Sequence, residues 1–380
     1  MVAQGDPEGA FVLAIETAER YPKSPAALTN VGFFYVQRRE PARARDAYAR
    51  ALALDRDNVE AQRGLAVACA QLGEPVPPAH ALVRAPFEGE GRAVELLVLV
   101  TLGSGNVVLE RLLDPRRFAV TKLAVELFDA RDDLPPHDVV FNAIGEADAA
   151  EPALALAAQI LRRPHGRVLN DPARIRSTGR AGVAQRLAGI PGLVVPAVEL
   201  VARDAFAARA WSFPTLLRAP GYHTGEHFER VDSALDLPGA LASVPGDPLF
   251  IIEYVDVADA GGIYAKYRMM AIGGELYPLH AAFGSHWKIH YFSSDMHVRA
   301  DLRDREAAFI RDARGVIGEA GYRALEAIVA ELGLEYMGID FALDRNGSVV
   351  LFEANATMAV RQGAGAEAIV ERWNALASGR

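Results

Sequence analysis

The segment GLEYMGIDFALDRNGSVVLFEANATM, residues 333–358, contains two apolar runs joined by a polar turn. The runs cover residues 336–343 and 348–354, and residues 344–347 between them end in Asn-Gly. An Asn-Gly pair between two β-rich runs is the strongest short signal for a β-hairpin. The sequence therefore predicts an antiparallel hairpin near the carboxyl end of the chain.

Three polar residues interrupt these apolar runs: Asp340 in the first, and Glu353 and Asn355 at the end of the second. Residues two apart on a strand share a face, so Glu353 and Asn355 point the same way. Pairing around the turn places Asp340 opposite them. Two carboxylates and an amide carbonyl suit Mg²⁺ with phosphate oxygens completing its coordination. The alternative is a plain hairpin whose acids reach solvent, although the flanking residues are very apolar for a solvated edge.

The spacing of Asp340, Glu353 and Asn355 resembles the metal-binding signature of the ATP-grasp superfamily. Members of that family join a carboxylate to an amine or a similar nucleophile through an acyl phosphate. The resemblance extends over residues 92–375. It implies an α/β (α+β) ATP-grasp fold with a preceding parallel-sheet domain, and ATP and Mg²⁺ (or Mn²⁺) as cofactors. It also implies that these three residues are the metal ligands.

Composition bounds the class of protein. The 380 residues are 51% hydrophobic and 23% charged, which indicates about two or three ordinary globular domains. The net charge of −9 argues against nucleic acid or an anionic membrane as the main partner. Cys69 is the single cysteine, so an intramolecular disulfide is excluded. The sequence shows neither a signal-peptide pattern nor an apolar run approaching the roughly 20 residues that span a bilayer. We expect a soluble, cytoplasmic protein.

The first part of the chain reads as amphipathic helices over residues 7–73, with breaks near residues 21–22, 39–41 and 55–58. Gln62, Leu65 and Cys69 lie 34 positions after Leu28, Val31 and Tyr35. This period resembles the tetratricopeptide repeat (TPR), with one complete repeat over residues 25–58 and half a repeat on either side. The resemblance implies a groove for a peptide or protein partner. The alternative is that these helices only cap or dimerise the enzyme.

The next part is rich in proline and glycine over residues 76–91, which predicts a linker. Strand-like runs follow at residues 92–102, 118–128 and 138–145, with a helix over 151–162. This alternation predicts a parallel, doubly wound sheet. DVVFNAIG, residues 138–145, resembles a strand of the D-alanine–D-alanine ligases, which implies a share in the acceptor-substrate pocket. Residues 103–106, GSGN, either bind an anion at a helix start or form a plain turn.

Two arginines occupy places where the family often has lysines that contact ATP. Arg180 lies in a helix expected over residues 175–187, after the short strand and turn at 168–172. Arg218 ends a strand expected over residues 213–219. The resemblance implies that His223, Thr224 and Gly225 then cover the phosphates. Arginine keeps the charge of lysine but binds phosphate with a different geometry. The alternative is a hairpin loop without a chemical role.

The following strand, residues 249–255, reads LFIIEYV. By resemblance, Glu253, Tyr254 and Val255 hold adenine and ribose, with Asp256 and Asp259 as further candidates for the ribose hydroxyls.

A strand over residues 263–272 places Lys266 and Arg268 on one face. The resemblance implies that these two catalytic cations bind the phosphate and the acyl phosphate; the alternative is a solvated strand face. Residues 285–297, SHWKIHYFSSDMH, suggest a basic loop over the transferred phosphate, with Lys288 as a nucleotide contact. A surface loop without a role is the alternative. Zinc binding by His286, His290 and His297 is disfavoured, because no thiol or carboxylate accompanies them.

The expected domains are TPR-like helices over residues 1–75, a linker over 76–91, a pre-ATP-grasp α/β domain over 92–170 and the ATP-grasp clamp over 171–380. Helices are expected at residues 305–314, 320–332 and 362–377. The implied function is an ADP-forming carboxylate–amine ligase acting on a small-molecule acid and amine or on a peptide, possible as a homodimer. The alternative is a non-catalytic ATP-binding scaffold, which the arginines at 180 and 218 favour. A kinase-like use of the same clamp is not separable from ligation.

Overall fold

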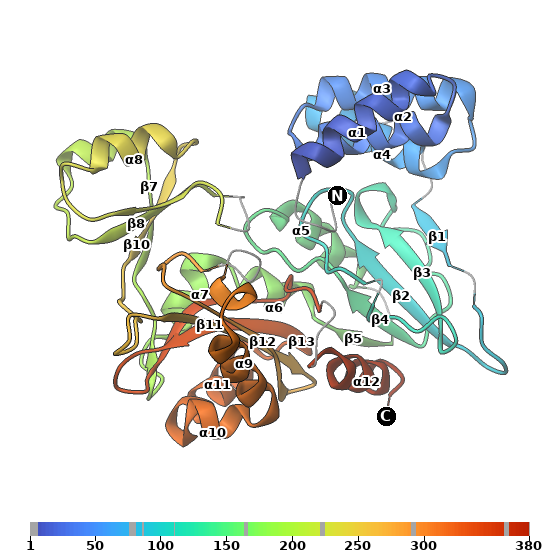
Figure 1. Cartoon of the computed structure of the whole chain (residues 1–380). Coiled ribbons are helices and arrows are strands. Elements are labelled where there is room, and N and C mark those ends of the chain that lie inside the picture. The colour runs from blue at the N-terminus through green and yellow to red at the C-terminus, as the bar shows by residue number, and fades with distance from the viewer. Residues whose placement is uncertain are drawn as a thin grey trace.

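The structure is a computed structural model that describes residues 7–75, 81–85, 87–109, 111–162, 166–220, 225–289, 294–360 and 365–379. A helical unit comes first, followed by a parallel sheet and then by two further sheets (Figure 1). Among the described helices, none has the length and apolar character needed to span a membrane.

The helical unit contains the helices predicted from the sequence: α1 (Pro7–Arg20), α2 (Pro25–Gln37), α3 (Pro41–Leu54) and α4 (Val59–Leu72). Ser24 and Asn58 cap α2 and α4 by accepting hydrogen bonds from backbone N–H groups of the first turn. Tyr48 fills the space between the helices. A Cβ atom on Gly32 or Gly64 would lie 2.7 or 2.2 Å from its ring, so this contact requires glycine at both positions.

The parallel sheet has the strand order β1-β3-β2-β4-β5. Its strands are β1 (Leu82–Arg84), β2 (Val94–Val100), β3 (Phe118–Ala124), β4 (Val139–Asn142) and β5 (Arg167–Leu169). Strands β2 to β5 are parallel, as predicted. The linker prediction for residues 76–91 is wrong in part, because β1 pairs antiparallel with β3 and extends the sheet. A three-residue edge strand is too short to show an apolar alternation among prolines and glycines.

Two helical predictions in this region need correction. The described residues between β2 and β3 form no helix, so residues 103–106 make no helix start for an anion. The helix expected over 175–187 is two helices, α6 (Pro172–Arg176) and α7 (Arg180–Leu187), separated by a turn that ends in Gly179. A 3-10 turn, Val125–Leu127, follows β3, and α5 (Glu151–Ile160) follows β4.

The remaining chain builds two antiparallel sheets. The smaller has the order β7-β10-β8-β9, with β7 (Val198–Val201), β8 (Thr215–Arg218), β9 (Phe228–Val231) and β10 (Leu249–Glu253). The larger has the order β12-β11-β13-β14-β6, with β6 (Leu193–Val194), β11 (Tyr264–Ile272), β12 (Glu275–Gly284), β13 (Tyr336–Leu343) and β14 (Val349–Asn355). Strand β6 joins β14 in parallel.

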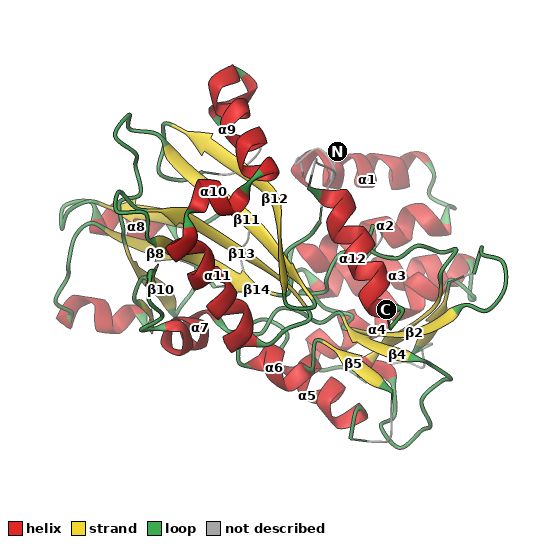
Figure 2. Ribbon diagram, turned by 90° about the horizontal axis from the view of Figure 1, so that it is seen from below, coloured by secondary structure: helices red, strands yellow, loops and turns green. Residues whose placement is uncertain are grey.

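Helices cover one face of the larger sheet (Figure 2). They are α9 (Ala300–Arg311), α10 (Ala313–Ile317) and α11 (Glu319–Leu332). The other helical segments are α8 (Leu237–Ser243), α12 (Ala366–Ala377) and the 3-10 turns Arg203–Ala208 and Asp295–His297. Ile339 and Phe341 of β13 are fully buried in the core that α9 and α11 share with the sheet. The opposite face of the sheet is therefore the one left for a site.

The predicted hairpin is confirmed as β13 and β14, and it is anchored to the parallel sheet. Asn170 lies after β5 in a left-handed conformation, with φ of +57°. Its amide donates to Tyr336 O and accepts from Tyr336 N, both at 2.8 Å. Gly145 after β4 packs against Ala356, and a Cβ atom there would lie 2.9 Å from the Ala356 carbonyl carbon. These contacts hold the carboxyl edge of the parallel sheet against the end of β14.

Candidate active site

A cavity of about 1540 Å³ lies over the exposed face of the larger sheet. Pockets for one small ligand are typically about 300–1,000 Å³. The cavity therefore has room for more than one ligand. Its walls include residues of the larger sheet, of β7, β8 and β10 in the smaller sheet, of α7 and α9, of the loops after β2 and β4, and of the helical unit.

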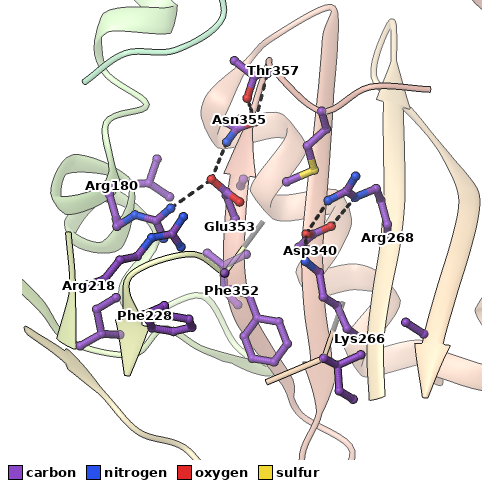
Figure 3. A pocket seen from close by; sticks show the side chains of 18 of the residues that line it. Arg180, Arg218, Phe228, Lys266, Arg268, Asp340, Phe352, Glu353, Asn355 and Thr357 are labelled. Atoms are coloured by element: carbon purple, nitrogen blue, oxygen red, sulfur yellow. Dashed lines mark hydrogen bonds and ion pairs between the residues drawn. The ribbon is translucent and has the colours of Figure 1, made fainter. Parts of the chain in front are cut away.

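Asp340 and Glu353 face each other across the hairpin on the floor of this cavity (Figure 3). Asp340 is fully buried and accepts two hydrogen bonds from Arg268, at 2.5 and 2.7 Å, while Lys266 Nζ lies 2.6 Å away. Burial alone would raise the pKa of Asp340, but Lys266 and Arg268 hold it below its usual range. Lys266 and Arg268 share a face of β11, as the sequence predicted.

Glu353 has partners on both sides. Arg180 Nη2 donates to its Oε1 atom at 3.1 Å, and Asn355 Nδ2 donates to the same atom at 2.9 Å. Burial raises the pKa of Glu353, but the charges of Arg180, Arg218 and Lys266 together outweigh it, so that the pKa lies below its usual range. The oxygen of the Asn355 amide accepts from the backbone N–H and the hydroxyl of Thr357. Glu353 and Asn355 therefore share one face, as predicted.

The donor types fit a hard divalent cation, but the Asn355 oxygen accepts from Thr357 and would have to turn toward Glu353. Two carboxylates oppose each other, and the Asn355 amide lies beside Glu353. Such oxygen donors are the ones that Mg²⁺ prefers. Among the described residues, no group of three or more His, Cys, Asp or Glu side chains could hold a metal. A cation at Asp340 and Glu353 would therefore need Asn355 and oxygens from a bound ligand, and the described histidines make no zinc site.

Arg180 and Arg218 come together from α7 and β8 to form the positive wall of the cavity (Figure 3). Burial, and then the charge of Arg180, lower the pKa of Arg218 to about 10. Each guanidinium lies over an aromatic ring: Arg218 is 5.4 Å from the centre of Phe228, and Arg180 is 6.0 Å from that of Phe250. Two guanidiniums that repel each other are stabilised by a shared polyanion such as a row of phosphates.

The nucleotide side predicted from β10 has mixed outcomes. Glu253, Tyr254 and Val255 line the cavity. The Glu253 carboxylate accepts a hydrogen bond from Ala197 N at 3.0 Å, and the Tyr254 hydroxyl accepts one from Arg230 at 3.0 Å. The apolar wall on this side includes Val198, Leu216, Phe250 and Ile252.

Asp259 is not among the residues that line the cavity. Its carboxylate accepts from the N–H groups of Gly261 and Ile263 and pairs with Arg305 at 3.0 Å. The expected ribose contact is therefore not supported, because the side chain closes its own turn. Asp256, the other candidate, is half exposed and also lies outside the cavity lining.

The loop after β12 reaches across the cavity to the smaller sheet. Lys288 Nζ donates to Phe228 O at 2.9 Å, and the Trp287 ring meets the Phe228 ring edge-on with centroids 5.4 Å apart. A Cβ atom on Gly225 would lie 3.1 Å from Lys288 Cε. Lys288 and Gly225 therefore sit together at the cavity, as a phosphate-covering role requires. His223, Thr224 and His290 lie outside the described residues.

Glu146 and Phe352 line the cavity but were not identified as site residues from the sequence. Glu146 lies in the loop after β4, at the carboxyl edge of a parallel sheet, where ligands commonly bind. That position was an available signal. Burial, followed by repulsion from Glu353 and Asp148, raises the pKa of Glu146 to about 7.

The other residue is Phe352. The register passes from Asp340 opposite Glu353 to Phe341 opposite Leu351, so Phe352 is an extra residue in a β-bulge. Its side chain lines the cavity and is 38% exposed. The bulge allows consecutive residues, Phe352 and Glu353, to face the same cavity. No local feature of the sequence indicates a bulge at this point.

No protein-family model and no curated protein matches the chain. Many solved structures are similar to it in fold, and three of them serve as examples. VanG D-Ala:D-Ser ligase from Enterococcus faecalis has 12% identity, coverage of 76% of this chain and 99% of its own, and a TM-score of 0.46. D-cycloserine synthetase DcsG has 17% identity, coverage of 75% and 99%, and a TM-score of 0.45. A RimK domain ATP-grasp protein from Sphaerobacter thermophilus has 16% identity, coverage of 74% and 98%, and a TM-score of 0.44. Similarity at this level assigns no function, so function has to be inferred from this chain's own residues.

Proposed function

We propose that the protein is an ADP-forming carboxylate–amine ligase of the ATP-grasp type, acting on a small-molecule acid and amine or on a peptide. The observation that carries this proposal is Asp340 directly opposite Glu353 on the floor of a large cavity. Three cations contact this pair: Lys266, Arg268 and Arg180. Transfer of a phosphoryl group between anionic oxygens depends on positioning and charge stabilisation, which this set supplies.

The nucleotide has a place in the cavity. In this proposal its base lies against Phe250, Ile252 and Phe352, and its phosphates lie at Arg180 and Arg218, all of which line the cavity. Lys288 also lines the cavity and, like Arg218, contacts Phe228. Asp340, Glu353 and Asn355 would hold Mg²⁺, which supplies charge neutralisation at the phosphates when bound.

The reaction follows from these placements. A substrate carboxylate oxygen attacks the terminal phosphorus of ATP, the bond to ADP breaks, and an acyl phosphate forms. Arg268 and Lys266 compensate the negative charge on the transferred group. The amine then attacks the acyl carbon, and inorganic phosphate leaves with its bonding electron pair. The amine loses a proton in this step, and Glu146, which lines the same cavity with a pKa of about 7, is suited to accept it.

One observation favours the second candidate, a non-catalytic nucleotide-binding scaffold. Lys266 and Arg268 already neutralise both oxygens of Asp340. A protein that never binds a metal would keep this arrangement permanently. In the ligase, Lys266 and Arg268 would also interact with the phosphates when ATP binds, and they would then neutralise Asp340 less completely.

The test is ATP turnover with Mg²⁺ across a panel of amino acids and short peptides, with ADP, AMP and phosphate measured separately. We expect acceptor-dependent ADP and phosphate from the wild type and a loss of about 100-fold or more in Glu353→Gln. The matched control is Glu319→Gln, an acid of α11 about half exposed and outside the cavity lining, which should retain full activity.

Other outcomes separate the alternatives. Release of AMP would contradict the acyl-phosphate reaction. Binding of ATP without turnover under any acceptor would favour the scaffold.

A further inference from the structure

The helical unit contains a similar five-residue pattern twice, with differences at the second and third positions. Residues 37–41 read QRREP and residues 71–75, which lie 34 positions later, read QLGEP. Both patterns end a helix with the same pair of backbone hydrogen bonds. After α2, Glu40 N donates to Tyr35 O at 2.9 Å and Arg39 N to Val36 O at 3.0 Å. After α4, Glu74 N and Gly73 N donate in the same way at 2.9 and 3.1 Å. This is the Schellman motif.

The motif requires a left-handed residue, for which glycine is the favoured type. Gly73 has φ of +69° and satisfies that requirement without strain. Arg39, at the equivalent position of the other copy, has φ of +59°. A side chain at this position is disfavoured because its Cβ atom crowds the backbone. Strained residues of this kind concentrate at functional sites.

Of the two copies of the pattern, the one that contains Arg39 reaches the cavity. Arg39 and Gln37 line the cavity whose floor is Asp340 and Glu353, whereas Gly73 does not. The helical unit lies beside the parallel sheet, whose loops after β2 and β4 line the same cavity (Figure 1). The cavity wall thus includes the acids Glu146 and Asp148 on the parallel-sheet unit and Arg39 on the helical unit.

We propose that Arg39 binds a carboxylate of the acceptor amine, so that the helical unit forms part of the substrate site. The proposal rests on the ligase function proposed above. A guanidinium pairs with a carboxylate through two parallel hydrogen bonds, and acids such as Glu146 attract an amino group. A substrate with both groups is an amino acid or a peptide with a free carboxyl end. The end of α2 is a position that favours glycine, and on this proposal it carries Arg39 instead because the arginine side chain binds substrate.

The test compares Arg39→Gly, Arg39→Lys and wild type in acceptor-dependent ADP release. The acceptors are amino acids and dipeptides, each as the free carboxylate and as the carboxyl-terminal amide. Arg50→Ala is the control, because Arg50 is an exposed arginine of α3 outside the cavity lining. We expect Arg39→Gly to raise the KM for carboxylate acceptors by about tenfold or more, with kcat and the KM for ATP unchanged. The preference for carboxylate over amide should disappear in Arg39→Gly and return in part in Arg39→Lys.

Stability gives an independent readout. Glycine relieves the left-handed strain, so the melting temperature of Arg39→Gly should equal or exceed that of the wild type. Lost acceptor affinity without lost stability separates a binding role from a structural one. If wild type turns over and Arg39→Gly has the same acceptor KM and the same preference, the ligase stands and this proposal is overturned. If wild type shows no acceptor-dependent ADP at all, the ligase itself fails, and this proposal with it.

Discussion

The carboxylate of Asp340 is buried between Lys266 and Arg268, and its charge compensates both cations. Asp340→Asn would remove that charge, and Lys266 and Arg268, which are both largely buried, would then lack a compensating negative charge. Breaking a buried ion pair by removing one partner is strongly destabilising. We expect the free energy of unfolding of the metal-free protein to fall by about 3 kcal/mol, measured by urea denaturation.

The control for this prediction is Asp301→Asn. Asp301 is 59% exposed and pairs with Arg299 on the surface, where solvent screens the ion pair and its contribution to stability is small. An equal loss of stability in the two variants would contradict the special role of burial at Asp340.

Glu146 predicts a pH dependence of stability. Its pKa is raised from 4.5 to about 7 in the folded protein, mainly by burial. The folded state therefore binds this proton more tightly than the unfolded state, and the stability of the wild type falls as pH rises from about 5 to 7. Glu146→Gln has no such proton. In metal-free protein, the free energy of unfolding of Glu146→Gln should rise relative to that of the wild type as pH increases over this window, by up to about 3 kcal/mol above pH 7.

Denaturation at pH 5 and pH 8 measures this difference for the two proteins. A gap that is the same at both pH values would show that the carboxyl group of Glu146 has an ordinary pKa.

At the scale of elements, the bulge in β14 gives Phe352 a role distinct from that of its neighbours. Phe352→Ala should weaken ATP binding by about tenfold, because the ring lines the proposed nucleotide site, yet leave stability nearly unchanged at 38% exposure. Titration calorimetry with ATP measures the first effect and thermal unfolding the second.

Phe341→Ala is the matched variant on the other face of the hairpin. Phe341 is fully buried, so its loss should cost about 3–5 kcal/mol of folding stability. If Phe352→Ala destabilises as much and ATP binds normally, Phe352 is a core residue and not a ligand contact.

The hairpin was predictable because its signals are local: Asn-Gly marks the turn, and the two-residue period fixes which residues share a face. The opposition of Asp340 and Glu353 follows from the turn once pairing is assumed. The bulge at Phe352 and the break at Gly179 between α6 and α7 depend on packing between distant elements. Strand β1 is defined by its partner β3 more than by its own residues. The turn that Asp259 closes depends on neighbouring residues, whereas the distance between Asp259 and the cavity depends on the tertiary fold.

At the scale of the whole molecule, the site depends on how the parallel sheet meets the hairpin. Gly145→Ala would place a Cβ atom 2.9 Å from the backbone of Ala356, directly after Asn355. The two elements then have to move apart, which shifts the candidate metal ligands relative to Glu146. We expect kcat to fall by about tenfold or more, since displacements of about 1 Å at an active site have effects of this size.

The control is Gly239→Ala, assayed for the same turnover, because Gly239 of α8 lies outside the cavity lining and a Cβ atom there would meet no neighbouring atom within 4 Å. An unchanged kcat in Gly145→Ala would mean that this contact does not position the site. Such contacts between units, like the approach of Arg39 to the cavity, link residues too distant in sequence for a pattern to reveal. For this reason the sequence predicted residues of the clamp and, by resemblance, a share of residues 138–145 in the pocket, but it indicated neither Glu146 nor Arg39 as a site residue.

Trp287 and Lys288 bridge the two sheets across the cavity through Phe228. In the proposed ligase, release of a nucleotide bound beneath this bridge would require the contacts to Phe228 to open and the smaller sheet to move through solvent. Product release of this kind limits turnover in many enzymes. Turnover should therefore slow in proportion to solvent viscosity when sucrose is added. Lys288→Ala should weaken this dependence of turnover on viscosity.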